Sequence, residues 1–109
     1  MPLRKQGPWL PMGYKLSNKA FVDVIEIYAY GAGKFGKAQA EKFYDGLLSK
    51  FARISQKPKL CRERKEVQPP VRVGTYSGHI IVYVIESKNV LILRVVHGRF
   101  DWQSDFADD

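Results

Sequence analysis

Large apolar residues recur at the helical period in two consecutive stretches of the chain. In residues 18–31 they stand at i, i+3, i+4 and i+7, namely at Phe21, Val24, Ile25 and Tyr28. Ser17 comes just before them and is a good N-cap, because its hydroxyl can accept a hydrogen bond from a free backbone N–H of the first turn. Residues 37–56 carry a longer stripe of the same period: Ala40, Phe43, Tyr44, Leu47, Leu48 and Phe51. The glycine-rich residues 31–36 separate the two stretches, so the pattern predicts two antiparallel helices.

Gly46 lies in the middle of the second helical stripe. A glycine at such a position costs about 1 kcal/mol relative to alanine. We therefore expect either that another backbone approaches it closely or that it is a tolerated surface glycine.

The second half of the chain has the pattern of strands. Three runs rich in β-branched residues, 71–76, 79–86 and 90–97, are separated by a Ser-Gly pair and a Ser-Lys-Asn triplet. Short turns between such runs predict two hairpins in an antiparallel sheet. Residues 14–16 are a candidate edge strand before the first helix.

The last two strands are apolar on both faces. Ile80, Val82 and Val84 alternate with Ile81, Tyr83 and Ile85, and the following strand repeats this pattern. One helical hairpin covers only one face of such a sheet. Trp102 and Phe106 in the C-terminal tail can shield part of the other face, and we expect the remaining apolar sheet surface to be left for a partner chain.

The length of 109 residues supports one domain with one core. Residues 1–12 contain three prolines and no period, so we expect an irregular N-terminal extension. Residues 13–109 are then a single α+β domain of order β-α-α-β-β-β, in which the helical hairpin packs on one face of a small antiparallel sheet and a short C-terminal tail follows.

The net charge of +7 is unevenly distributed. Residues 50–72 contain eight basic and only two acidic side chains, whereas residues 100–109 contain four aspartates and no base. A basic patch of this kind attracts acidic partners, either a nucleic acid or an acidic protein segment. The alternative is a merely solvated surface.

Cys61 is the only cysteine, which excludes an internal disulfide and leaves no cluster of metal-ligand spacing. We expect no metal or cofactor and a location in the reducing cytoplasm. No apolar run approaches the ~18 residues of a membrane span, so no membrane partner is expected.

Residues 94–103 read RVVHGRFDWQ and close the predicted order of elements. Together with YKLSNKAFVDVIEIYAY in the first helix, FGKAQAEKFYDGLLSKFARI in the second and VRVGTYSGHIIVYVI before the last strand, this text resembles the ParE branch of the RelE/ParE toxins. The resemblance covers about residues 13–106. It implies the toxin of a type II toxin–antitoxin system, which poisons DNA gyrase and is neutralised by a ParD-like antitoxin. Contact with DNA would then be indirect, through the antitoxin's DNA-binding domain.

The related RelE branch, whose members are ribosome-dependent mRNA endoribonucleases, supplies the alternative function. In that case His97 is the candidate acid or base, and the candidate phosphate ligands are Arg64, Arg72 and Arg94, with Arg99 as a further cation. A histidine without a placed partner makes no catalytic site, so His97 can equally be a structural residue that bonds to the backbone at a strand end. We favour a protein binder over an enzyme.

For a protein binder, the candidate contact residues lie in and after the last strands: Arg72, Arg94, His97, Arg99, Phe100 and Trp102. Aromatic side chains dominate binding hot spots. The alternatives are that the arginines pair with a carboxylate such as Glu86, and that either Phe100 or Trp102 belongs to the core.

Overall fold

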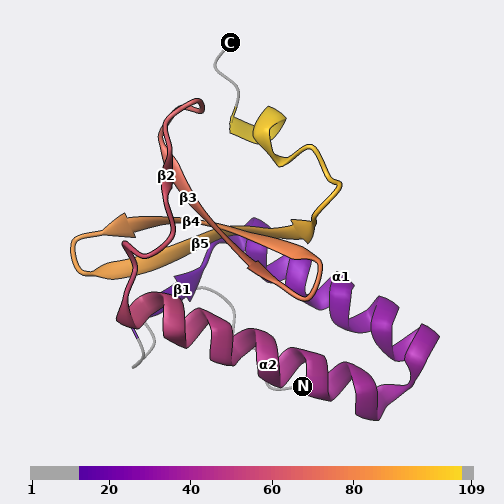
Figure 1. Ribbon diagram of the computed structural model, residues 1–109. Coiled ribbons are helices and arrows are strands. Elements are labelled where there is room, and N and C mark those ends of the chain that lie inside the picture. Colours follow the sequence, from indigo (N-terminus) through magenta and orange to yellow (C-terminus); the bar gives the residue numbers. More distant parts are fainter. Residues whose placement is uncertain (1–12, 107–109) are drawn as a thin grey trace.

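The computed structural model describes residues 13–106, so the expected extension 1–12 lies outside the described residues. The elements in chain order are β1 (Tyr14–Leu16), α1 (Asn18–Phe35), α2 (Lys37–Gln56), β2 (Glu63–Arg64), β3 (Val71–Tyr76), β4 (His79–Glu86), β5 (Asn89–His97) and the 3-10 helix η1 (Trp102–Phe106). Figure 1 shows the two helices along one side of the sheet and η1 beyond its other side. The α+β class and the helical hairpin on one face are confirmed.

Helix α2 spans the predicted residues, but α1 runs four residues further than predicted. Its start is fixed by Ser17, whose hydroxyl accepts from the N–H of Ala20 at 3.0 Å. Gly31 and Gly33 do not end it, because a glycine weakens a helix without blocking it. The helix ends at Gly36, which has φ of 94° and donates its N–H to the carbonyl of Ala32.

The sheet has the strand order β1-β5-β4-β3-β2. The pairs β3–β4 and β4–β5 are antiparallel, as predicted. The sheet as a whole is mixed, since β1 pairs with β5 in parallel and places Tyr14 opposite Val90. A short strand that was not predicted, β2, adds to the outer edge of β3.

A β-bulge in β5 changes the face of its residues. Val82 pairs with Arg94 and Tyr83 pairs with Ile92, so Leu93 has no partner opposite it. The carbonyl of Leu93 instead accepts from the hydroxyl of Ser17 at 2.9 Å. Residues on either side of the bulge therefore do not follow the strict alternation expected from the sequence, and Ile92 and Val95 both face the helices.

The main core lies between the helical hairpin and the sheet. Its buried side chains come from both helices and three strands and include Tyr14, Val24, Leu47, Phe51, Ile81, Tyr83, Ile92 and Val95. Ile25, which we placed on the inner stripe of α1, is 38% exposed. The inner stripe instead uses Ala20, Val24, Ile27 and Tyr28.

The chain itself covers much of the second sheet face. Val67, from the segment before β3, and Trp102, from η1, are buried there against Val71, Val82 and Val96. Among residues 13–106, the large apolar side chains that are exposed belong to α1, the loops and the tail, and none belongs to the sheet. The most exposed apolar side chains therefore lie off the sheet, whereas Val73, Ile80, Val84 and Leu93 on its second face stay partly exposed. None of the helices in residues 13–106 has the length and apolarity needed to cross a membrane.

Candidate functional site

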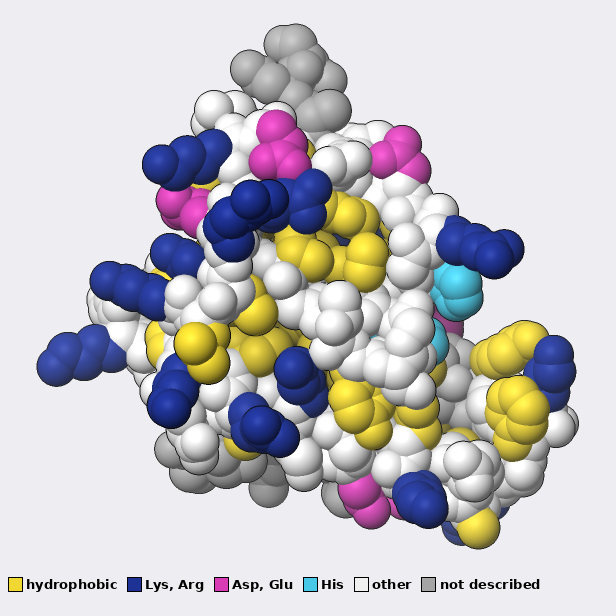
Figure 2. Space-filling view, viewed as in Figure 1, with side chains coloured by type: hydrophobic (Ala, Val, Ile, Leu, Met, Phe, Trp, Pro, Cys, Tyr) yellow, Lys and Arg dark blue, Asp and Glu magenta, His cyan; other side chains and the backbone are white. Residues whose placement is uncertain are grey.

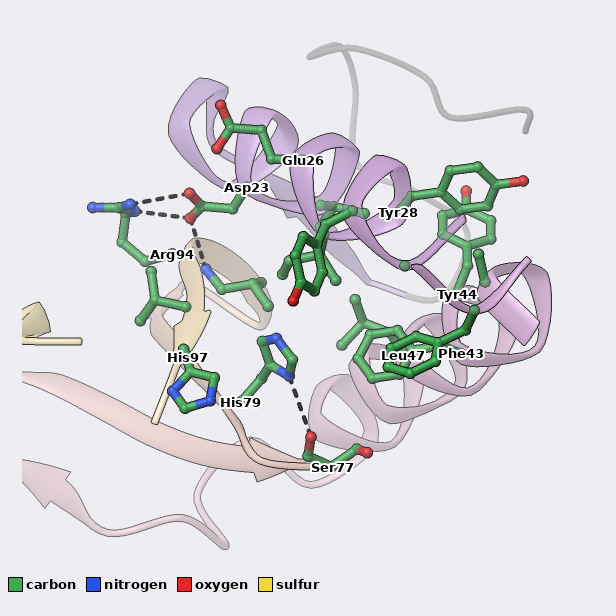
Figure 3. Close-up of a pocket in the computed structure, with 18 of the residues that line it drawn as sticks. Asp23, Glu26, Tyr28, Phe43, Tyr44, Leu47, Ser77, His79, Arg94 and His97 are labelled. Carbon is green, nitrogen blue, oxygen red and sulfur yellow. Dashed lines mark hydrogen bonds and ion pairs between the residues drawn. The ribbon is translucent and has the colours of Figure 1, made fainter. Parts of the chain in front are cut away.

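A groove with a volume of about 790 Å³ opens between the helical hairpin and the end of the sheet where β4 begins and β5 ends (Figure 3). Its walls are mainly apolar and aromatic: Val24, Ile27, Tyr28 and Tyr30 of α1, Ala40, Phe43, Tyr44 and Leu47 of α2, and Val95 and Val96 of β5. Pockets of this size with apolar walls and a few polar groups are typical binding sites.

Exposed aromatic side chains frame the groove. Tyr30 and Phe35, near the end of the hairpin, are 65% and 63% exposed, and Phe100, after β5, is 45% exposed. The ammonium group of Lys34 lies 5.6 Å from the Tyr30 ring centre and 5.8 Å from that of Phe35. Figure 2 shows apolar side chains standing out at this end of the hairpin. Large exposed rings at the rim of an apolar groove are typical of a protein-binding surface.

Arg94 forms the polar corner of the groove. Its Nε and Nη2 donate to the carboxylate of Asp23 at 2.8 and 3.0 Å, and its Nη1 donates to Asp105 of η1. The N–H of Val95 also donates to Asp23, at 2.9 Å. Hydrogen bonding to Asp23 raises the pKa of Arg94 above its ordinary value. Arg94 thus ties α1 and the tail to β5, and its guanidinium lies 5.4 Å from the ring centre of Phe100.

Two histidines lie opposite each other at the sheet end of the groove. His79 of β4 pairs with His97 of β5, and their ring centres are 5.8 Å apart (Figure 3). Phe43 packs against His79, and the centres of their rings are 5.3 Å apart. Each ring contacts the nearby backbone: His97 Nδ1 accepts from the N–H of Arg99 at 3.2 Å, and His79 Nδ1 lies 3.3 Å from the carbonyl of Ser77.

The side chains of the other candidate residues are not among those that line this groove. Arg72 donates to the carbonyl of Cys61 at 2.6 Å, and Arg64 pairs with Glu66 at the edge strand β2. Trp102 is buried in the second core, with the guanidinium of Arg64 5.4 Å from its ring centre. The side chain of Arg99 is exposed after β5.

The structure therefore groups Arg94, His97 and Phe100 at one groove and separates them from Arg64 and Arg72. The four residues considered for nuclease chemistry do not converge on one point. Within residues 13–106 no group of three or more His, Cys, Asp or Glu side chains is placed to hold a metal ion. What the groove can do with these groups is bind an apolar surface and hold a few polar groups at its corner.

Sequence reasoning did not assign the helical side of the groove. Phe43, Tyr44 and Leu47 were read as core residues, and they are core residues that also line the groove wall. Tyr30 and Phe35 gave a usable signal, because they are large aromatics that lie off the inner stripe of their helix.

Comparison with known proteins gives concordant results. The family model described as ParE toxin of type II toxin-antitoxin system, parDE, matches residues 14–102. The Toxin ParE3 of Caulobacter vibrioides is 29% identical over 84 residues, which are 77% of this chain and 77% of that protein. A chain in the solved structure of the chromosomal ParDE TA system from P. aeruginosa aligns with a TM-score of 0.68 and 23% identity, covering 79% of this chain and 95% of that one. The structural likeness concerns the fold.

Proposed function

Since the chain belongs to the ParE toxin family of type II toxin–antitoxin systems, we propose that it is a toxin that acts by binding proteins and not by catalysis. The support for binding is the apolar groove with its exposed aromatic rim. The support against catalysis is the separation of Arg64 and Arg72 from His97. Cleavage of a phosphodiester bond requires the general acid, the general base and the cationic side chains to surround the same phosphate.

The groove is the proposed seat of a ParD-like antitoxin, and the single observation that supports this best is its shape. It is an apolar channel between two helices and a sheet end, with Tyr30, Phe35 and Phe100 at its rim. An amphipathic helix buries its apolar face in a channel of this kind. The antitoxin segment would thereby cover the exposed aromatics of the free toxin. Isothermal titration calorimetry of the purified toxin with its antitoxin measures the affinity of this contact directly.

The proposed target is DNA gyrase, on the strength of family membership. The test is a supercoiling assay with purified gyrase and relaxed plasmid, with and without the toxin. We expect the toxin to inhibit supercoiling and equimolar antitoxin to restore it. If micromolar toxin arrests cells but leaves supercoiling unchanged, gyrase is not the target.

A further inference from the structure

We propose that the face formed by the end of α2 and the segment that leads to β3 binds the phosphate backbone of duplex DNA. The end of α2 and the segment that follows it carry six cationic side chains, which we call the cationic face: Lys50, Arg53, Lys57, Lys59, Arg62 and Lys65. All except the half-buried Lys50 are exposed. Figure 2 shows dark blue side chains gathered on the left of the molecule, over the end of α2 and toward β2.

Within residues 13–106 none of the six cations forms an ion pair, and the carboxylate of Glu66, which pairs with Arg64, also interacts at longer range with Arg62. The only acids between residues 50 and 72 are Glu63 and Glu66. A group of cations that outnumbers the nearby acids produces a positive potential that attracts polyanions.

The spacing of the cations suits a nucleic-acid strand. Lys50 and Arg53 lie in the last turns of α2 and Lys57 is the C-cap residue directly after it, so the three are spread over roughly 10 Å along the helix axis. Successive phosphates of one strand advance by about 3.4 Å along a duplex, so three of them fit this length. Next to them, Lys57, Lys59 and Lys88 border a hollow of about 600 Å³ at the β4–β5 turn.

The make-up of the face favours a duplex over a protein or a single strand. Lysine is depleted at the centres of protein interfaces, where aromatic anchors are enriched. The only aromatic residue between residues 50 and 65 is Phe51, and its side chain is fully buried. Proteins that bind single strands stack bases on exposed aromatic rings. A face with cations and without such rings contacts phosphates and reads no sequence.

The cationic face and the groove use different parts of α2. The groove is lined by the helix between Gln39 and Leu47, whereas the cationic face starts at Lys50. A partner confined to the groove therefore touches none of the six cations. This direct contact goes beyond the expectation, drawn from the family resemblance, that the toxin meets DNA only through its antitoxin.

The test compares two triple variants of equal charge by fluorescence anisotropy with a short labelled duplex of mixed sequence over a series of salt concentrations. The face variant is Arg53→Gln, Lys57→Gln and Arg62→Gln. The control variant is Lys19→Gln, Lys34→Gln and Lys37→Gln, which removes three exposed lysines elsewhere. Each lowers the net charge from +7 to +4, because three positive charges are removed.

We expect the face variant to lose at least about tenfold in affinity and its log–log salt slope to fall by up to about 3, since each phosphate contact contributes about 0.9. The control variant should stay within about threefold of the unmodified protein, and the unfolding midpoints of all three proteins should agree. If both variants lose the same affinity for DNA, the effect comes from net charge alone and the proposal is overturned.

Three further measurements decide between classes of partner. A single strand that binds more tightly than the duplex would overturn the duplex assignment. Leu60 is the one large apolar side chain exposed between residues 50 and 72, at 78%. If a polyglutamate peptide binds more tightly than the duplex, and Leu60→Ala weakens binding of that peptide, the face is a protein interface. No gyrase or antitoxin is present in these assays, so their outcome is independent of the proposed target.

Discussion

Arg94 on β5 is bound to Asp23 on α1 by two hydrogen bonds of 2.8 and 3.0 Å, although 71 residues separate them in the chain. Both side chains are largely buried, with 14% and 10% of their surface exposed. Asp23 also accepts the N–H of Val95, which lies just after the bulge of β5. One carboxylate therefore holds a helix, an irregular strand and, through Arg94, the tail in their relative positions.

We expect Asp23→Ala to lower the free energy of unfolding by about 3 kcal/mol. Removing one partner of a buried ion pair leaves the other charge without compensation, which costs about 3–5 kcal/mol, and Asp105 retains part of the pairing here. Urea denaturation measures this change. The matched control is Glu26→Ala, an exposed acid one turn further along α1, for which the change should stay within about 0.5 kcal/mol. Similar losses in both variants would contradict the role of the pair.

Tyr30 and Phe35 should contribute to antitoxin binding and little to stability. We expect Tyr30→Ala and Phe35→Ala each to weaken binding of the antitoxin by about tenfold or more, because large aromatic side chains are enriched among interface hot spots, whose truncation costs about 2 kcal/mol or more. Isothermal titration calorimetry measures the affinity. Leu60→Ala, in the loop after α2, is the control and should bind the antitoxin with unchanged affinity. An unchanged affinity in both aromatic variants would remove the groove rim from the interface.

Replacing His97 separates a binder from a nuclease. His97 is exposed and its Nδ1 accepts a backbone N–H, so His97→Ala should fold normally. We expect this variant to arrest growth as the unmodified toxin does, since a binder needs no acid or base at this position. Growth curves after induction give the readout. If the variant loses toxicity but keeps its stability and its antitoxin affinity, the chemistry of His97 is essential and the protein is an enzyme.

The effect of Gly46→Ala should depend on Tyr76. A Cβ atom at Gly46 would overlap the hydroxyl and ring of Tyr76, which packs on Phe43. We expect Gly46→Ala to destabilise the fold by about 1–2 kcal/mol, as overpacking does. In a Tyr76→Ala background the same change should stabilise it by about 1 kcal/mol, the helix propensity of alanine over glycine. A double-mutant cycle measured by thermal or urea unfolding tests this contact. If Gly46→Ala destabilises the protein equally in the presence and absence of the Tyr76 side chain, the contact is contradicted.

Tyr83 should make the fold sensitive to alkali. Burial raises the pKa of Tyr83 above the ordinary value of about 10, and its hydroxyl donates to the carbonyl of Pro58 at 2.7 Å. The unfolded chain releases this proton near pH 10 and the folded chain does not, so the contribution is complete below pH 10 and is lost as the pH rises above it. Above pH 10, the free energy of unfolding of Tyr83→Phe should therefore fall less steeply with pH than that of the unmodified protein, by up to about 1.4 kcal/mol per pH unit. The exposed Tyr30→Phe is the control, and equal slopes in the two variants would contradict the assignment.

Local patterns in the sequence were sufficient for much of the fold. The stripe from Ala40 to Phe51 predicts α2 with its observed ends, and the turn signals place β3 and β4 correctly. The parallel pairing of β1 was not predictable, because it depends on β5, far along the chain. The bulge at Leu93 was also not predictable, because the carbonyl of Leu93 accepts its hydrogen bond from Ser17, which is far away in the chain.

The candidate site was predicted on one side only. The text around Arg94 and His97 identified the strand that borders the groove, and both residues line it. The helical wall was missed because Phe43 and Leu47 fit the periodic stripe of a core, and periodicity does not tell a residue that fills a core from one that also borders a cavity. The cationic face was visible as a charge run, but only the fold shows that, within residues 13–106, none of its cations forms an ion pair.

The pairing of β1 with β5 has a consequence for how the protein is made. Tyr14 to Leu16 leave the exit tunnel early in translation, but the strand they join, around Val90 to Ile92, is among the last segments to be synthesised. The nascent chain can form its helices as it emerges, yet it cannot close its sheet until translation is nearly over. A product that terminates before β5 lacks Arg94 to His97 and Phe100, so it cannot complete the wall of the groove.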